Sequence, residues 1–166
     1  NQIKNEMESF YIYLSMAAHL ESADLPGSAR WMRAQAREEL AHGMKLFDYV
    51  TERGGRVALA PIPAPAADFG SMLDVFKAAL AHEQHVTASI HKLYDLASKE
   101  QDYATQVMLQ WFISEQVEEE ANAGQIVAQL AKVGSHVAPL FALDGLLSGH
   151  ALVLGPPHAD QLRQRR

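Results

Sequence analysis

The chain of 166 residues contains no cysteine. This absence excludes a disulfide framework, a thiolate metal site and a thiol nucleophile. No apolar run is long enough to span a bilayer, so we expect no membrane partner. No secretory signal is visible, and a cytoplasmic location is therefore the default expectation.

Basic residues are in the minority, with 14 Lys and Arg against 20 Asp and Glu and a net charge of −6. They form no stripe along a helical pattern, which argues against a nucleic-acid partner. Hydrophobic residues make up 48% of the chain, enough for an ordered domain with a sizeable core. Asn1 already lies inside a helical pattern and is not a methionine, so we expect further residues to precede it.

Helical periodicity dominates the chain and predicts an all-α fold with four long helices and a short fifth one. The helices are expected over residues 1–23, 26–53, 71–99, 103–133 and 139–154. Residues 56–70 contain three prolines and no helical periodicity. They predict a long extended crossover along the bundle between the second and third helices. We expect residues 1–154 to form one domain and residues 155–166 a flexible polar tail.

Acidic side chains fall on the apolar faces of the four long helices. Apolar residues recur there at steps of three and four, the pattern of helices packed in a bundle. The acids on these faces are Glu6, Glu39, Glu83, Glu115 and Glu119, and the second helix adds His42. An isolated buried carboxylate is costly, so it must be paired, protonated or bound to a metal. Carboxylates from four helices and one imidazole therefore suggest a metal site inside the bundle.

The fourth helix shows this pattern with two acids in succession. Its apolar face is expected at Met108, Phe112, Glu115, Glu119, Asn122 and Ile126. The alternative for the run Glu118-Glu119-Glu120 is a solvated acidic face. Because Glu115 and Glu119 share the face, we expect part of the run to point inward.

Glu39 and His42 are spaced i and i+3, so both can reach one ion from the same helix face. A lone pair of this kind is usually solvated surface, and it is the position on the apolar face that favours a metal. Oxygen ligands with one imidazole suit iron, manganese or zinc. For Glu83 the alternative is a salt bridge to a buried Arg.

Several other side chains have simpler structural readings. Tyr13 and Trp111 fit core aromatics, and Tyr13 then needs a partner for its hydroxyl. His82, His85 and His91 flank the apolar face of the third helix, and we interpret them as surface or interface residues.

From Asn5 to about Asp144 the sequence resembles bacterial non-heme ferritins. The resemblance rests on NEMESFYIYLSMA at 5–17, LPGSARW at 25–31, QAREELAH at 35–42, LFDY at 46–49, HEQ at 82–84, and QDYAT with LQWFISEQVEEE across 101–120. Two long hairpins joined by one long crossover are also the topology of ferritin-like bundles.

The resemblance implies an iron-oxidising and iron-storing homo-oligomer, a cage of about two dozen subunits that takes Fe(II) with O2 or H2O2. It places the first iron at Glu6, Glu39 and His42. The second iron would lie at Glu83 and Glu119, with Glu39 bridging and Gln116 beside it. A third iron site would use Glu38, Glu115 and Glu118, with Glu119 shared. Tyr13 and Trp111 match the aromatic neighbours of this di-iron centre.

Three departures from the patterns of related families limit which ferritin-like proteins the chain resembles. A second E-x-x-H motif would need His at position 118, where Glu118 stands, which argues against bacterioferritin and rubrerythrin. Leu40 stands where bacterioferritin has its heme-ligating Met, so we expect no heme. After Asp144 the chain differs from common family members.

The outward apolar residues Trp31 and Phe69 are expected to pack between subunits.

Three alternatives stay open from sequence. One is a di-metal oxidase or peroxidase of the rubrerythrin type that turns over without storing iron. Another is a structural cage subunit with an inactive centre. The third is a helical interaction module without a metal.

Overall fold

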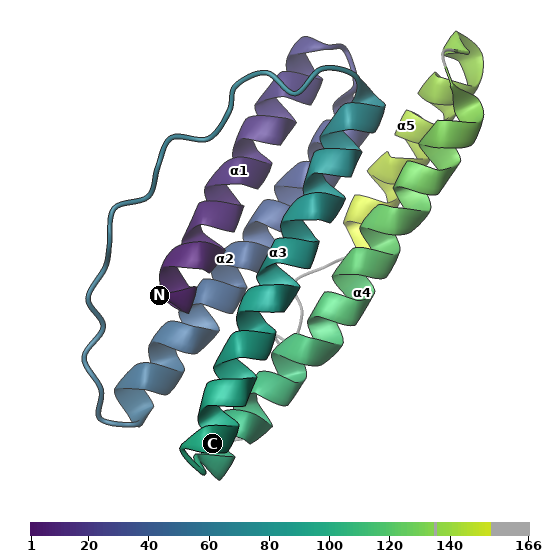
Figure 1. The fold of residues 1–166 in the computed structure, drawn as a ribbon. Coiled ribbons are helices and arrows are strands. Elements are labelled where there is room, and N and C mark those ends of the chain that lie inside the picture. Colours follow the sequence, from purple (N-terminus) through teal and green to yellow (C-terminus); the bar gives the residue numbers. More distant parts are fainter. Residues whose placement is uncertain (135, 154–166) are drawn as a thin grey trace. The chain divides into compact units, whose positions relative to one another are not determined.

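The computed structural model describes residues 1–134 and 136–153, and over these residues the protein consists of five helices and connecting segments without strands (Figure 1). The helices are α1 (Gln2–Ser22), α2 (Pro26–Glu52), α3 (Met72–Lys99), α4 (Tyr103–Val133) and α5 (Val137–Val153). This confirms the expected all-α class and the short fifth helix, which begins at Val137 rather than Pro139. The predicted tail, residues 155–166, lies outside the described residues.

The described helices form two compact units. The first contains Asn1, Ile3–Asp68 and the described residues from 136 onward, and therefore holds α1, α2 and α5. The second contains Gln2 and Phe69–Gly134, and therefore holds the hairpin of α3 and α4.

In the first unit, α1 and α2 approach closely where a glycine replaces a side chain. Pro26 opens α2 at one of its first two positions, where the missing N–H costs no helical hydrogen bond. Farther along α2, a Cβ on Gly43 would lie 2.7 Å from the terminal methyl of Met7 and 3.3 Å from the Cβ of Glu6. This close approach brings the backbone of α2 against α1 at the level of Glu6.

The end of α2 and the following crossover agree with the sequence prediction. Gly54 has φ +74, and the N–H groups of Gly54 and Gly55 donate to the carbonyls of Thr51 and Val50. This pair of bonds is the Schellman motif that ends many helices. The chain then runs extended alongside α1 (Figure 1). The Ser15 hydroxyl donates to the carbonyl of Ala66 over 2.6 Å and fastens the crossover to α1.

The helix α5 packs against α2. Asp144 of α5 is buried and accepts hydrogen bonds from the backbone N–H groups of Gly27 and Ser28, at 3.0 and 2.7 Å. These are orphan donors of the first turn of α2, so a carboxylate from a distant helix caps it. A Cβ on Gly27 would lie 1.8 Å from the carbonyl oxygen of Asp144, so the contact leaves no room for a side chain there.

The outward position predicted for Trp31 is wrong, because its exposed fraction is 2%. The N-terminal half of α2 buries almost every residue from Gly27 to Ala36. A helix with one packing partner buries a single stripe, whereas α2 also carries α5 and buries more of its circumference. Phe69 is half-buried.

In the second unit both helices begin with a side-chain cap. Ser71 and Asp74 form a reciprocal capping box at the start of α3, which agrees with the helix start expected at residue 71. Asp102 caps α4 by accepting from the backbone N–H of Thr105. Such caps contribute about 1 kcal/mol each to helix stability. They fix where α3 and α4 begin, and therefore which side chains share a face.

The apolar face predicted for α4 is partly wrong. At every second predicted position the buried residue is the next one along the chain. The buried residues are Leu109, Phe112, Gln116, Glu119, Ala123, Ile126 and Leu130. Met108, Glu115 and Asn122 are half-buried. The predicted and observed faces share positions 112, 119 and 126. Because Gln116 is polar, the sequence does not indicate that this residue rather than Glu115 is buried. On α1, Ile3 and Phe10 are likewise half-buried.

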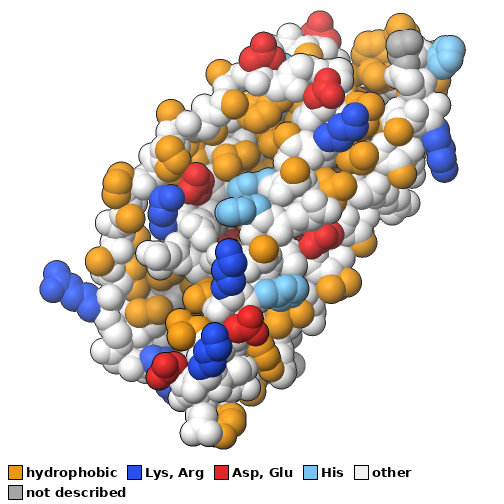
Figure 2. Space-filling view, viewed as in Figure 1, with side chains coloured by type: hydrophobic (Ala, Val, Ile, Leu, Met, Phe, Trp, Pro, Cys, Tyr) orange, Lys and Arg blue, Asp and Glu red, His pale blue; other side chains and the backbone are white. Residues whose placement is uncertain are grey.

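Charged and hydrophobic side chains are intermingled on the face seen in Figure 2. None of the helices in the described part of the chain combines the length and the apolarity that a membrane crossing requires.

Candidate metal centre

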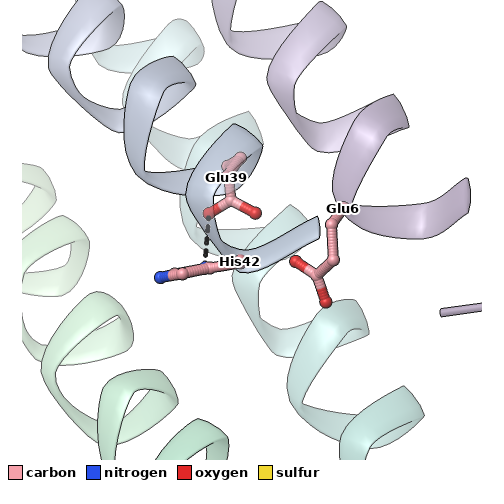
Figure 3. A group of neighbouring side chains, drawn as sticks. All are labelled: Glu6, Glu39 and His42. Carbon is pink, nitrogen blue, oxygen red and sulfur yellow. Dashed lines mark ion pairs between the residues drawn. The ribbon is translucent and has the colours of Figure 1, made fainter. Parts of the chain in front are cut away.

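Three of the predicted ligands come together in the first unit. Glu6 projects from α1, and Glu39 and His42 project from successive turns of α2 (Figure 3). Each offers a ligand atom, and these atoms all lie within 4.8 Å of one another. The exposed fractions of the three residues are only 1–2%. The E-x-x-H spacing thus places both groups of α2 on its buried face, opposite Glu6.

Burial and, to a smaller extent, the positive charge of Lys45 together lower the pKa of His42 from 6.5 to about 4. The imidazole is therefore neutral near pH 7. Its Nδ1 lies 3.9 Å from Oε1 of Glu39, a contact that becomes an ion pair only when His42 is protonated. A neutral imidazole has a lone pair that can bind a cation.

The chemistry of this donor set fits a divalent cation. Two buried carboxylates close together are strongly unfavourable unless protons or a cation neutralise them. Carboxylate oxygens and one imidazole nitrogen are the ligands that iron, manganese and zinc accept in proteins. The residues therefore fit the metal type that the sequence predicted.

A second group of predicted residues meets in the other unit. Gln116 of α4 donates from Nε2 to Oε2 and to the backbone carbonyl of Glu83 on α3, at 3.0 and 3.2 Å. Both residues are buried, with exposed fractions of 3% and 1%. Glu119 is buried one turn from Gln116 on α4. The α3–α4 hairpin thus carries two buried carboxylates and one buried amide.

The residues predicted for a third site are less buried. Glu38 is half-buried and accepts a hydrogen bond from Nε2 of Gln35 over 2.9 Å. Glu115 is half-buried and Glu118 is exposed. Their side chains therefore retain access to water, unlike Glu6, Glu39 and Glu83.

The two predicted aromatic neighbours differ in burial. Tyr13 has an exposed fraction of 1% and lies two turns from Glu6 on the buried face of α1. Trp111 is half-buried and contacts Phe112 edge to face, with ring centroids 4.8 Å apart. Of the three histidines assigned to the surface or an interface, His85 and His91 are exposed and His82 is half-buried.

Three residues that hydrogen-bond near the site or at the start of α2 were not predicted from the sequence. Thr87 and Glu120 extend the hydrogen bonds of Gln116, and Asp144 caps α2. Thr87 lies one helical turn after Glu83, and this spacing could have indicated that both lie on the same face of α3. Asp144 is the one acid in the apolar α5, and an isolated carboxylate in such a segment was the available signal.

Long helices with a buried group of two carboxylates and one imidazole, each offering a ligand atom, fit the class of helical metal-binding proteins. The ferritin-like domain family (Ferritin) matches residues 1–133 of this chain. Bacterial non-heme ferritin from Staphylococcus haemolyticus is 36% identical over 151 residues, 91% of each chain. The protein of the same name from Bacteroides fragilis is 39% identical over 146 residues, 88% of this chain and 91% of that one.

Solved structures agree with these relatives. The open-pore ferritin of the archaeon Archaeoglobus fulgidus matches with a TM-score of 0.88 and 47% identity, over 89% of this chain and 91% of that chain. A closed form of the Archaeoglobus ferritin, engineered by site-directed mutagenesis, matches with a TM-score of 0.87 and 48% identity, over 89% and 90%. The chain therefore belongs to the ferritin family, and its fold is ferritin-like with a short C-terminal helix.

Proposed function

We propose that this protein stores iron by oxidising Fe(II) to Fe(III), with O2 or peroxide as oxidant, and by keeping the product as a ferric mineral inside a homo-oligomeric cage. The observation that carries the proposal is the buried group of Glu6, Glu39 and His42 in a chain of the ferritin family. These residues fall in the E-x-x-H motif and the N-terminal stretch on which the resemblance to non-heme ferritins rests.

We assign Glu6, Glu39 and His42 to the first iron and Glu83 and Glu119 to the second, with Glu39 bridging the two. Burial of Glu83 and Glu119 within the α3–α4 hairpin supports their assignment, because buried acids need a neutralising partner. Gln116 belongs beside the second iron. Tyr13 and Trp111 are the aromatic neighbours of the pair.

The chemistry requires two ferrous ions that react together. Each gives up one electron, and the two electrons reduce one O2 to peroxide. The neutral His42 and the carboxylates hold the ions before and after this electron loss. The ferric products hydrolyse and leave for storage. Glu38, Glu115 and Glu118, which are more open to water, form a third site that receives iron in transit.

The assembly and the location follow from the family. We propose a homo-oligomer of 24 subunits in the cytoplasm, because the relatives and the matching solved structures are ferritins.

The test is aerobic addition of Fe(II) to the metal-free protein, followed by size-exclusion chromatography with detection of protein and iron. We expect iron to elute with protein at the mass of a cage. Iron oxidation by a small oligomer that retains no iron would indicate a di-metal oxidase instead. A cage that neither oxidises nor retains iron would indicate a structural subunit.

A further inference from the structure

A chain of hydrogen bonds runs from the surface of the α3–α4 hairpin to Glu83. The Thr87 hydroxyl donates to Oε1 of Glu120 over 2.6 Å. The same hydroxyl oxygen accepts from Nε2 of Gln116 over 3.3 Å, and Nε2 also donates to Glu83. Thr87 and Glu120 are half-buried, whereas Gln116 and Glu83 are buried.

The direction of each bond in this chain follows from its outer end. A carboxylate oxygen of Glu120 only accepts, so the one hydrogen of the Thr87 hydroxyl is committed to it. The Thr87 oxygen can then only accept from Gln116. Gln116 must therefore present its NH2 group, rather than its carbonyl oxygen, to Thr87. Glu83 imposes the same choice from the other end, because its carboxylate and backbone carbonyl also only accept.

This arrangement matters once a cation engages Glu83. A cation draws on the lone pairs of the Glu83 carboxylate and weakens its hydrogen bond to Gln116. The hydrogen bond that Gln116 donates to Thr87 does not depend on the Glu83 carboxylate, and it still holds the NH2 group of Gln116. The carbonyl oxygen of Gln116, on the other side of the amide, then keeps its orientation through metal binding and release.

We propose that Thr87 and Glu120 are positioning residues for the second iron site, acting through Gln116 on Glu83. The proposal rests on the proposed function, because it takes Glu83 as a ligand of that site. Hydrogen-bonded partners that orient ligands typically change metal affinity 10- to 100-fold when they are removed.

The test compares three variants with one matched control. Thr87→Val keeps the side-chain shape and removes the hydroxyl, Thr87→Ser restores the hydroxyl, and Glu120→Ala removes the acceptor of the Thr87 hydroxyl. The control is Thr105→Val. The Thr105 hydroxyl donates to Oδ2 of Asp102 over the same 2.6 Å, in the same unit and also half-buried, but at the N-cap of α4.

The measurement is calorimetric titration of each metal-free protein with Zn(II), together with the visible absorption spectrum of the Co(II) form. For the native protein we expect two classes of site. Thr87→Val and Glu120→Ala should weaken the second class about tenfold and shift the Co(II) bands, while the first class is unchanged. Thr87→Ser should restore both signals, and Thr105→Val should leave both as in the native protein.

The outcomes separate the two proposals. Native-like second-site affinity and spectra in Thr87→Val and Glu120→Ala would overturn the positioning role while leaving the iron centre intact. An equal change in Thr105→Val would overturn it too, since the effect would then reflect stability alone. A native protein with only one class of site would overturn the two-iron centre and the positioning role with it. If Thr87→Val does not fold, Glu120→Ala decides, because it removes the acceptor and leaves Thr87 itself unchanged.

Discussion

Asp144 in α5 accepts hydrogen bonds from both the backbone N–H and the hydroxyl of Ser28 in α2, each over 2.7 Å. A third bond comes from the N–H of Gly27. One buried carboxylate therefore satisfies three donors at the start of another helix, next to the positive end of that helix. The position of α5 on α2 depends on this cap and on the absence of a side chain at Gly27.

The first prediction concerns this cap. Asp144→Ala leaves three buried donors without an acceptor, and we expect a loss of about 3 kcal/mol, the range for hydrogen bonds to a charged group. Hydrogen–deuterium exchange by mass spectrometry compares the variant with the native protein. The exchange rate should increase more in α5 than in α1. Gly27→Ala should have the same effect through its clash with the Asp144 carbonyl.

The matched control for the glycine is Gly124→Ala in α4, where a Cβ would meet nothing within 4 Å. Because Ala is the better helix former, this variant should be as stable as the native protein or more so by up to about 1 kcal/mol. Unchanged exchange of α5 in both Asp144→Ala and Gly27→Ala would contradict the role given to the cap.

Glu39 should matter most among the ligands, because it is assigned to both ions. We expect Glu39→Ala to abolish rapid Fe(II) oxidation in stopped-flow absorbance with O2, while circular dichroism shows an unchanged helix content. The metal-free variant can even gain stability, since removing a buried acid relieves its desolvation. Asp48→Ala, at an exposed position of the same helix, should oxidise Fe(II) at the native rate. Near-native fast oxidation by Glu39→Ala would refute the assignment.

Glu38, Glu115 and Glu118 should affect the iron chemistry after the first oxidation step. As ligands of a third site they do not hold the iron pair, so their Ala variants should keep a fast first phase. The ratio of iron oxidised to O2 consumed should change, which an oxygen electrode measures alongside the absorbance. Loss of the first phase in all three variants would show that the division between pair and third site is wrong.

His42 should make the metal-free protein sensitive to acid. Its pKa is about 4 in the folded protein against 6.5 when unperturbed. Between these values the unfolded chain binds a proton that the folded one does not, so the free energy of unfolding falls as pH drops from 6.5 towards 4. Urea unfolding at several pH values gives the free energy of unfolding as a function of pH. This free energy should change less steeply with pH for His42→Gln than for the native protein. Parallel curves would mean that His42 does not contribute.

Deletion of residues 155–166 should leave a large, iron-loading oligomer. This segment has adjacent prolines and low apolar content, so it offers little surface for assembly. Light scattering of the metal-free truncated protein should give the mass of the full-length assembly. A monomer or small oligomer would show that the segment, or bound iron, is needed for assembly.

The helices and their ends could be read from the sequence because local chemistry determines them. Ser71 starts α3 through its own hydroxyl, and Gly54 ends α2 because it can adopt a positive φ. The E-x-x-H spacing likewise placed Glu39 and His42 on one face. Each of these features depends on residues within one or two helical turns.

Features that depend on contacts between helices could not be read in the same way. Periodicity fits either flank of α4, and only the packed hairpin shows that Gln116 rather than Glu115 is fully buried. Trp31 looked like an outward residue because the packing of α5 on α2 leaves no local pattern. Ser9, a buried polar residue of α1, is satisfied by its bond to the carbonyl of Asn5, which periodicity alone does not reveal.

The crossover between α2 and α3 also has a practical consequence. Residues 56–60 and Ile62 line a pocket together with residues of α1 and α2. After Pro63 and Ala64, the carbonyl of Ala66 accepts a hydrogen bond from Ser15, which holds the segment to α1. Pro63 and Ala64 themselves are exposed. Doubling the length of a flexible loop costs only about 0.6 kcal/mol. A foreign peptide inserted between Pro63 and Ala64 should therefore be tolerated, which makes this bond a suitable point for displaying epitopes or enzyme tags.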